Sequence, residues 1–163
     1  MKIRVHSHEG AATLHPRRYG ATRAAMIRMT TMPSFVPLVF ATAYVATVEV
    51  RYADVTPQTW EYIYPEEHDL IEAQRNAGHA MWVMTDEHAQ QIADFLYLVQ
   101  GQLDLLVVHC DAGISRSSAV ATAAAEMYGL DEELERLQSN KRYSPNQYVL
   151  SMVRKHIALR KPQ

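Results

Sequence analysis

The chain has 163 residues, 48% of them hydrophobic and 21% charged, as expected of one globular domain over residues 1–163. This composition excludes a disordered, collagen-like or low-complexity protein. The formal net charge of -2 provides no overall field that would attract nucleic acid or an anionic membrane. The single cysteine excludes an internal disulfide framework and a cysteine-rich zinc site.

Signals for targeting and for metal binding are weak. The chain contains no run of about eighteen apolar residues, and residues 1–10 are too polar for a signal peptide. We therefore expect a cytoplasmic protein whose partners are neither nucleic acid nor membrane. His6 and His8 would lie on the same side of a strand, but without a third ligand. We expect no metal.

The first third of the chain is predicted to supply three strands. Residues 2–6 alternate weakly in polarity, and residues 24–29 form a short apolar run that ends before Pro33. Residues 43–51 are rich in Val and Thr, which favour a strand.

Two helices are predicted next. The first spans residues 66–77, between Pro65 and Gly78. The second runs through Gln100 and is capped by Thr85, with its apolar residues on one stripe.

The remaining third is predicted to contain one strand and three helices. Residues 103–109 include a continuous apolar run, typical of a central strand that is buried on both faces. Residues 117–128 are almost wholly small and apolar, which predicts a buried helix. Residues 131–138 form a short helix, and Ser144 caps a last one over residues 145–159. Strands alternating with helices indicate an α/β fold with a central sheet.

The residues that carry chemistry lie where the predicted central strand meets the buried helix, in the string His-Cys-Asp-Ala-Gly-Ile-Ser-Arg-Ser at 109–117. The N–H groups of such a loop form a nest for an anion, and the helix dipole adds positive potential. Gly113 permits the tight turn, and Arg116 can bind two phosphate oxygens at once. Cys110 lies at the base, where the field favours its thiolate. Each residue alone is ordinarily structural, but together they predict a phosphate site with a nucleophile beneath it.

This string resembles the active-site signature of the protein tyrosine phosphatase superfamily, and most of all that of its small dual-specificity-type members. The resemblance covers residues 43–159. It implies a central, mostly parallel sheet of four to five strands flanked by helices. It also implies hydrolysis of phosphomonoesters through a cysteinyl-phosphate, with no metal or other cofactor.

The resemblance implies a role for each residue of the string. Cys110 attacks phosphorus, and Arg116 binds its equatorial oxygens. His109 orients the loop and favours the thiolate, and Ser117 stabilises the departing thiolate in the second step. Main-chain N–H groups complete the phosphate loop at Asp111, Ala112, Gly113, Ile114, Ser115 and Arg116.

The family also uses an aspartate on a separate loop as general acid. We expect Asp54, which follows the strand predicted at 43–51. Asp86 is the alternative, although a carboxylate in the first turn of a helix needs no further explanation. Cys110 lies 56 residues after Asp54, which is farther than usual in the family. We attribute the extra length to an insertion over residues 57–84.

A second match lies near the C-terminus, where residues 142–146 read Arg-Tyr-Ser-Pro-Asn. This segment resembles, with a shorter middle, the Arg-x-x-x-Pro-Asn pattern that opens the last helix of the family. We expect it to pack beneath the phosphate loop.

The favoured substrates are phosphotyrosine proteins, with phosphoserine and phosphothreonine proteins also open. Asp111 and Ile114 occupy positions where phosphoinositide-type members often carry lysine, which disfavours highly charged inositol phosphates. Aromatic residues near the acid loop could bind an aromatic substrate: Tyr52, Trp60, Tyr62 and Trp82. Two alternatives remain, a catalytically weak module that binds phosphoproteins and a phosphatase for a non-protein phosphate ester.

Overall fold

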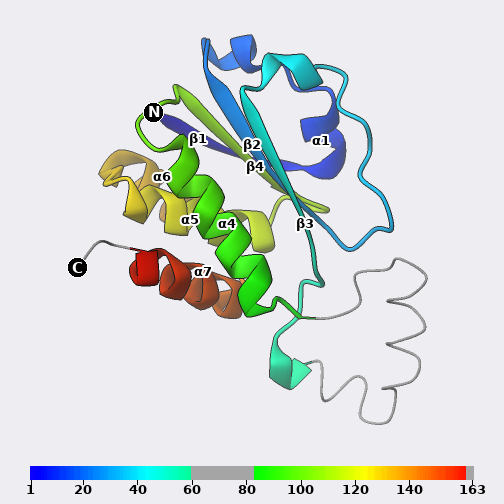
Figure 1. The fold of residues 1–163 in the computed structure, drawn as a ribbon, viewed down its shortest axis with the longest axis vertical. Helices are drawn as coiled ribbons and strands as arrows, with labels where there is room; N and C mark the ends of the chain where they lie inside the picture. Colours follow the sequence, from blue (N-terminus) through cyan, green and yellow to red (C-terminus); the bar gives the residue numbers. More distant parts are fainter. Residues whose placement is uncertain (60–82, 161–163) are drawn as a thin grey trace.

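A parallel sheet lies at the centre of the computed structural model, which describes residues 1–59 and 83–160 (Figure 1). Its four strands lie in the spatial order β1-β4-β2-β3, and every neighbouring pair is parallel. The strands are β1 (Lys2–Ser7), β2 (Ala24–Thr30), β3 (Ala46–Arg51) and β4 (Leu105–Cys110). The predicted α/β fold with a mostly parallel sheet is therefore confirmed.

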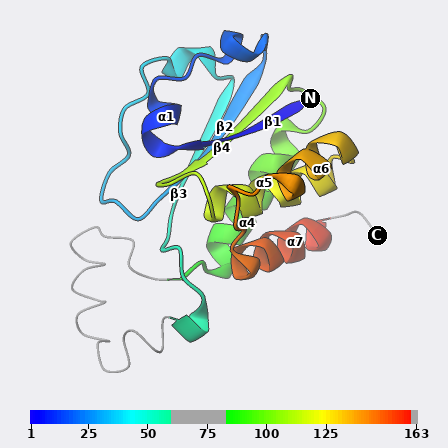
Figure 2. The ribbon, with the colours of Figure 1, turned by 180° about the vertical axis from the view of Figure 1, so that it is seen from behind.

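Helices cover both faces of this sheet. In Figures 1 and 2, α1 lies on one face and α4, α5 and α7 lie on the other. The helices are α1 (His8–Ala12), α4 (Asp86–Val99), α5 (Arg116–Met127), α6 (Asp131–Ser139) and α7 (Gln147–Arg160), with 3-10 turns η1 (Pro16–Tyr19) and η2 (Ala41–Ala43). None of the described helices combines the length and apolarity needed to cross a membrane.

Strand β4 separates two hydrophobic cores. All six of its residues are buried, as its continuous apolar run predicts. Leu105 and Val107 pack into the core on the α1 side, whereas Leu106, Val108 and Cys110 pack into the core beneath α4, α5 and α7. Because side chains alternate along a strand, the apolar register directs Cys110 toward the start of α5.

Several predicted boundaries are wrong by two or three residues. Strand β3 begins at Ala46 instead of residue 43, because residues 41–43 form the turn η2. Strand β4 spans residues 105–110 instead of 103–109. The last helix begins at Gln147, because the Asn146 side chain, rather than Ser144, accepts the N–H of Val149 at 3.1 Å.

Two other predictions have different outcomes. His6 and His8 do not share one side of a strand, because Ser7 ends β1 and caps α1, whose first residue is His8. The helix expected over residues 66–77 lies outside the described residues.

Candidate active site

The phosphate loop, residues 111–116, connects β4 to α5 at the carboxyl edge of the parallel sheet. Strand β4 extends one residue beyond its predicted end, so Cys110 is its last residue and Arg116 is the first residue of α5. Ligands of open parallel sheets bind at this edge, in the crevice beyond the strand ends.

The main-chain N–H groups of the phosphate loop are free to bind a ligand. Those of Ala112, Gly113, Ile114 and Ser115 donate to no acceptor among the described residues. Ser115 is the N-cap residue of α5, but its side chain makes no capping hydrogen bond. Adjacent main-chain donors without an acceptor, at the start of a helix, form the kind of nest that binds anions, so this cluster indicates a candidate site for an anion.

Gly113 allows the phosphate loop to contact the end of β1. Its φ is +70°, and a Cβ atom there would lie 2.5 Å from the carbonyl carbon of His6 and 2.6 Å from the nitrogen of Ser7. Neither main-chain atom can move away as a flexible side chain could. The glycine predicted for a tight turn therefore also permits a close approach of two main chains.

Cys110 and Ser117 lie together at the base of the phosphate loop. The Cys110 Sγ atom is 3.1 Å from the Ser117 Oγ atom, and the two residues are 1% and 0% exposed. A serine hydroxyl can donate to a thiolate at this position. The pairing expected from the resemblance is thus present as a contact.

The Arg116 guanidinium is buried and held on two sides. Its Nη1 donates to the carbonyl of Tyr52 at 2.7 Å, and its Nη2 donates to the Asp111 carboxylate at 2.6 Å. Burial lowers the pKa of Arg116, but the ion pair with Asp111 outweighs burial and raises it overall. The Nε atom is buried and makes no hydrogen bond with the described residues.

The Asp111 side chain is held within the site, whereas the sequence analysis considered it only for its effect on substrate choice. Its carboxylate accepts from Thr30 Oγ1 at 2.5 Å, from Thr31 Oγ1 at 2.8 Å and from Thr31 N at 3.2 Å. Burial raises the pKa of Asp111, but these bonds and Arg116 lower it well below its usual range. Asp111 is therefore ionised at neutral pH.

His109 is fully buried within the sheet, where its Nε2 accepts the Nε–H of Arg28 at 3.2 Å. Burial first, and then the charge of Arg28, lower the pKa of His109 to about 3. His109 is therefore neutral at physiological pH. Arg28 is only 4% exposed and also binds Glu49 and the carbonyl of Val36. The sequence analysis did not identify this buried arginine. Its only signal was a single charged residue within the apolar run of residues 24–29.

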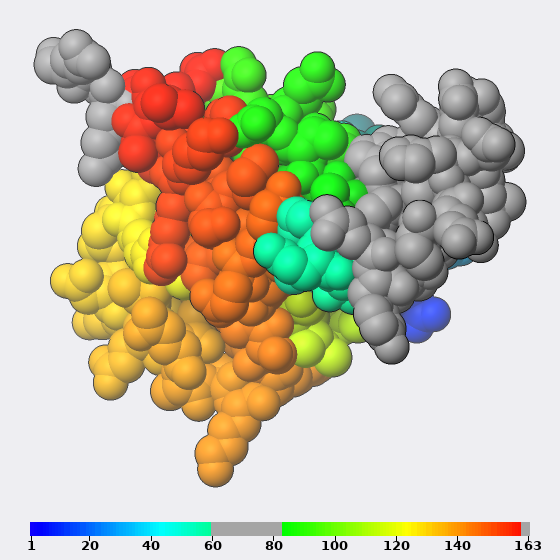
Figure 3. Space-filling view, turned by 90° about the horizontal axis from the view of Figure 1, so that it is seen from below, coloured from blue at the N-terminus to red at the C-terminus, as the bar shows by residue number. Residues whose placement is uncertain are grey.

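Asp54 lies at the mouth of the phosphate loop. Its Oδ1 atom accepts from Ser115 Oγ at 2.9 Å and from Asn146 Nδ2 at 3.0 Å. The Oδ2 atom has no hydrogen-bond partner among the described residues. Figure 3 shows the residues after β3 beside the start of α7, where Asn146 lies. Asp54, 56 residues before Cys110, is thus brought to the phosphate loop.

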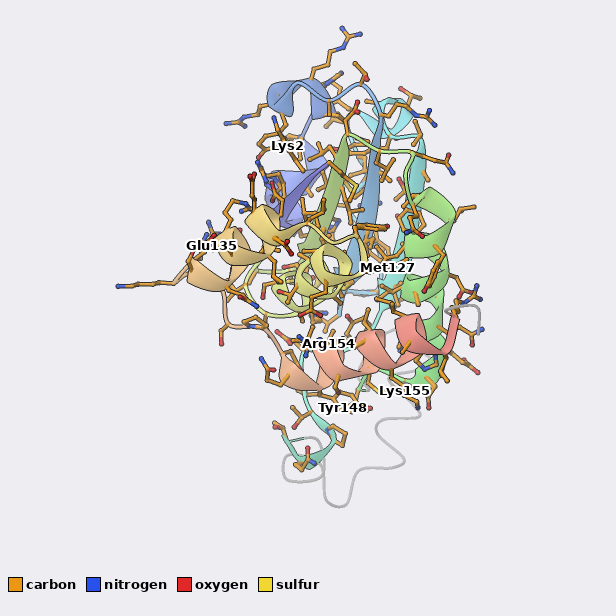
Figure 4. The ribbon with its side chains drawn as sticks, turned by 90° about the vertical axis from the view of Figure 1, so that its left-hand side faces the viewer. Lys2, Met127, Glu135, Tyr148, Arg154 and Lys155 are labelled. Carbon is orange, nitrogen blue, oxygen red and sulfur yellow. The ribbon has the colours of Figure 1, made fainter. Side chains whose placement is uncertain are left out.

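Asp86 lies elsewhere, on the exposed side of α4. Its Oδ1 atom accepts from Lys155 Nζ at 2.7 Å and contacts His156 Nε2 at 2.8 Å. These bonds, first from Lys155 and then from His156, lower the pKa of Asp86. Figure 4 shows Lys155 on α7, the helix that packs against α4. Asp86 therefore links two helices and makes no contact with the phosphate loop.

The segment before α7 supports the phosphate loop, as expected. The N–H of Ser144 donates to the carbonyl of Ile114 at 3.2 Å, and the N–H of Asn146 donates to that of Ser115 at 3.4 Å. Asn146 was expected to have a structural role only. Its side chain also holds Asp54, so it joins three loops that are distant in sequence.

The surroundings of the phosphate loop are partly described. A cavity of about 790 Å³ lies beside Asp111, lined by residues of α1 and of the segment 31–37, a volume suited to a small ligand. Tyr52 is fully buried, whereas Trp60, Tyr62 and Trp82 and most of the insertion predicted at 57–84 lie outside the described residues. Within the described ranges, no group of three His, Cys, Asp or Glu side chains could hold a metal ion.

Solved structures resemble this chain along nearly its whole length. PTPMT1 in complex with PI(5)P is 14% identical, with a TM-score of 0.57 over 97% of this chain and 91% of that chain. Human DUSP28 is 19% identical, with a TM-score of 0.49 over 96% of this chain and 92% of that chain. No family model and no curated protein match the sequence. The likeness to PTPMT1 is one of fold: this chain and PTPMT1 share the same overall fold over nearly their whole lengths.

Proposed function

We propose that the chain is a cysteine-dependent phosphatase that hydrolyses phosphomonoesters through a cysteinyl-phosphate. One observation carries the proposal. The main-chain N–H groups of residues 112–115 and the Nε of Arg116 have no acceptor among the described residues, and they follow directly after the buried thiol of Cys110. Such a cluster of donors can bind the three peripheral oxygens of a phosphoryl group. A purely structural cysteine would need none of them.

In the first step, the Cys110 thiolate attacks phosphorus. The S–P bond forms as the P–O ester bond breaks, and the leaving oxygen takes a proton from Asp54. The unpartnered Oδ2 atom of Asp54 is the position for that proton, since Oδ1 already accepts two hydrogen bonds. Arg116 and the loop N–H groups stabilise the negative charge on the equatorial oxygens.

In the second step, water attacks phosphorus and passes a proton to Asp54. The S–P bond breaks, inorganic phosphate leaves, and the thiolate of Cys110 returns. Ser117 donates its hydroxyl proton toward the departing sulfur, which is 3.1 Å away. This hydrogen bond makes the thiolate a better leaving group.

His109 has a narrower role in this proposal than the resemblance implies. Because it is neutral, it contributes no positive charge to the Cys110 thiolate. Its bond with Arg28 fixes the ring and places the imidazole proton on Nδ1. His109 therefore orients the phosphate loop, and the thiolate is stabilised by Ser117, Arg116 and the main chain.

Phosphotyrosine proteins are the favoured substrates, with phosphoserine and phosphothreonine proteins also included. The solved structure of PTPMT1 holds PI(5)P, so a phosphoinositide is the second candidate. The phosphate loop of this chain carries an ionised Asp111 and an apolar Ile114. A carboxylate beside the phosphate site opposes a headgroup with several phosphates.

The test measures the release of inorganic phosphate from four substrates, with EDTA present. The substrates are para-nitrophenyl phosphate, a phosphotyrosine peptide, a phosphoserine peptide and vesicle-borne phosphoinositide. Removal of the nucleophile in Cys110→Ser should lower kcat by more than about 1,000-fold. A phosphoenzyme trapped by acid quench should appear in wild type and not in the variant. Wild-type turnover that persists in Cys110→Ser would overturn the proposal. Phosphate binding without turnover would support the binding-module alternative.

A further inference from the structure

The Asp111 carboxylate accepts four hydrogen bonds, from Thr30, from the side chain and main chain of Thr31, and from Arg116. Both of its oxygens are occupied, by Thr30 on Oδ1 and by Thr31 and Arg116 on Oδ2. Its main-chain carbonyl also accepts the N–H of His8 at 3.2 Å. Asp111 thus ties the carboxyl ends of β1 and β2 to the first residue of α5.

These contacts fix the orientation of the Arg116 guanidinium. A guanidinium is a rigid plane with five N–H groups. Tyr52 holds Nη1 and Asp111 holds Nη2, so the plane is constrained at both ends of the fork. Two of the five N–H groups are thus engaged and three remain for an anion, among them the Nε–H, whose nitrogen is buried without a partner in the described residues.

We propose that Asp111 is a positioning residue that acts through Arg116, an inference that rests on the proposed phosphatase function. Thr30 and Thr31 hold its carboxylate, and the carboxylate holds Nη2. The N–H groups that remain, the Nε–H among them, then face the phosphoryl oxygens in the geometry of the transition state. Without the Asp111 carboxylate, the guanidinium keeps its charge. It is then held only by the hydrogen bond from Nη1 to the carbonyl of Tyr52, so its plane can rotate.

If Asp111 orients Arg116, its removal should affect turnover and phosphate binding differently, whereas loss of a purely structural residue should weaken both. The Asp111 charge repels any phosphate dianion, so removing it favours ground-state binding. Loss of orientation, in contrast, weakens only the interactions that are completed in the transition state. The variant Asp111→Asn should therefore turn over more slowly without binding phosphate more weakly.

The experiment measures kcat, inhibition by inorganic phosphate and inhibition by vanadate, which adopts the five-coordinate geometry of the transition state. In Asp111→Asn we expect kcat to fall by about 10- to 100-fold and vanadate inhibition to weaken by a similar factor. Inhibition by phosphate should stay within about 3-fold or become tighter. Thr31→Val removes one support of the carboxylate and should give the same pattern with a smaller loss.

A double-mutant cycle with Arg116→Lys tests whether Asp111 acts through the arginine. If it does, Asp111→Asn should add less than about 3-fold to the loss caused by Arg116→Lys. Glu133→Gln is the matched control, because Glu133 also accepts from two arginines, Arg4 and Arg136, and none of these hydrogen bonds involves the phosphate loop. Its kcat should equal that of wild type.

Three outcomes would overturn the inference: an unchanged kcat in Asp111→Asn, equal losses of phosphate binding and turnover, or additive losses in the cycle. Failure of the proposed function has a different signature, the absence of wild-type turnover. In that case the inference about Asp111 is tested by binding alone, with calorimetry of vanadate and of phosphate to wild type and to Asp111→Asn. Equal changes in both affinities would contradict it.

Discussion

Helices α4 and α5 pack on the same face of the sheet but begin in opposite ways. At α4, the Thr85 side chain accepts the N–H of His88, and the His88 side chain accepts the N–H of Thr85. Asp86 and Glu87 add negative charge to the first turn. At α5, Ser115 makes no capping bond, no acidic residue lies in the first turn, and Arg116 is buried there instead.

Both helix starts have N–H groups without an acceptor in the helix main chain and a positive dipole end, so the difference lies in what satisfies these groups. At the start of α4, the side chains of Thr85 and His88 accept these N–H groups, and no ligand is needed. Helix α5 forgoes a cap, which is ordinarily worth about 1 kcal/mol. Its hydroxyl at the cap position donates to Asp54 instead. The uncapped start of α5 indicates a site kept open for a ligand, at the expense of stability.

The largest expected effect separates the two aspartates next to these helix starts. Asp54→Asn should lower kcat by about 100-fold or more, because it removes the proposed general acid. The loss should be greater with phenyl phosphate than with para-nitrophenyl phosphate, since the poorer leaving group depends more on protonation. Asp86→Asn is the control and should leave kcat unchanged. Equal losses in the two variants would remove the distinction between Asp54 and Asp86.

The next largest expected effect is a difference in stability between alanine variants of two glycines with positive φ, Gly113 and Gly129. Gly113→Ala should cost about 3 kcal/mol, from the left-handed backbone and from overlap with the main chain of β1. A loss of that size lowers Tm by about 10 °C in a chain of this length. Gly129 ends α5 with a φ of +63° and has no atom within 4 Å of an added Cβ. Gly129→Ala should therefore cost only about 1 kcal/mol, and calorimetric melting of both variants checks the pair.

The buried His109 should make the fold sensitive to acid. Its folded pKa of about 3 lies below the value of 6.5 expected in the unfolded chain. Between these values the unfolded chain binds one more proton, so stability falls as the pH falls. The slope contributed by His109 approaches about 1.4 kcal/mol per pH unit. His109→Gln should lose that slope in urea unfolding between about pH 6 and pH 4. Identical slopes in variant and wild type would contradict the assignment.

The smallest effect concerns the cap itself. Thr85→Ala removes a capping side chain and should lower the free energy of unfolding by about 1 kcal/mol. Ser115→Ala removes a hydroxyl that caps nothing and should change it by less than about 0.5 kcal/mol. Its measurable effect should be on kcat, through the lost bond to Asp54. If Ser115→Ala destabilised the fold as much as Thr85→Ala, the contrast between the two helix starts would fail.

Much of the fold could be read from local patterns. The apolar run of β4, the cap at Thr85 and the glycine after α5 each place an element within a residue or two, because they act on neighbouring residues. The start of α7 was misplaced because Ser144, Pro145 and Asn146 are all favourable near a helix start. Only the structure shows that Asn146 is the cap, through the bond that its side chain accepts from the N–H of Val149.

The phosphate loop could be proposed from the sequence alone, because Cys110, Gly113, Arg116 and Ser117 lie within eight consecutive residues between one predicted strand and one predicted helix. Tertiary structure alone decided that Asp54 rather than Asp86 reaches this loop, and that Thr30 and Thr31 hold Asp111. Those partners are about 60 to 80 residues apart in sequence. Their proximity follows from the order of strands in a parallel sheet, which gathers the strand ends at one edge, and no local preference of the chain encodes that order.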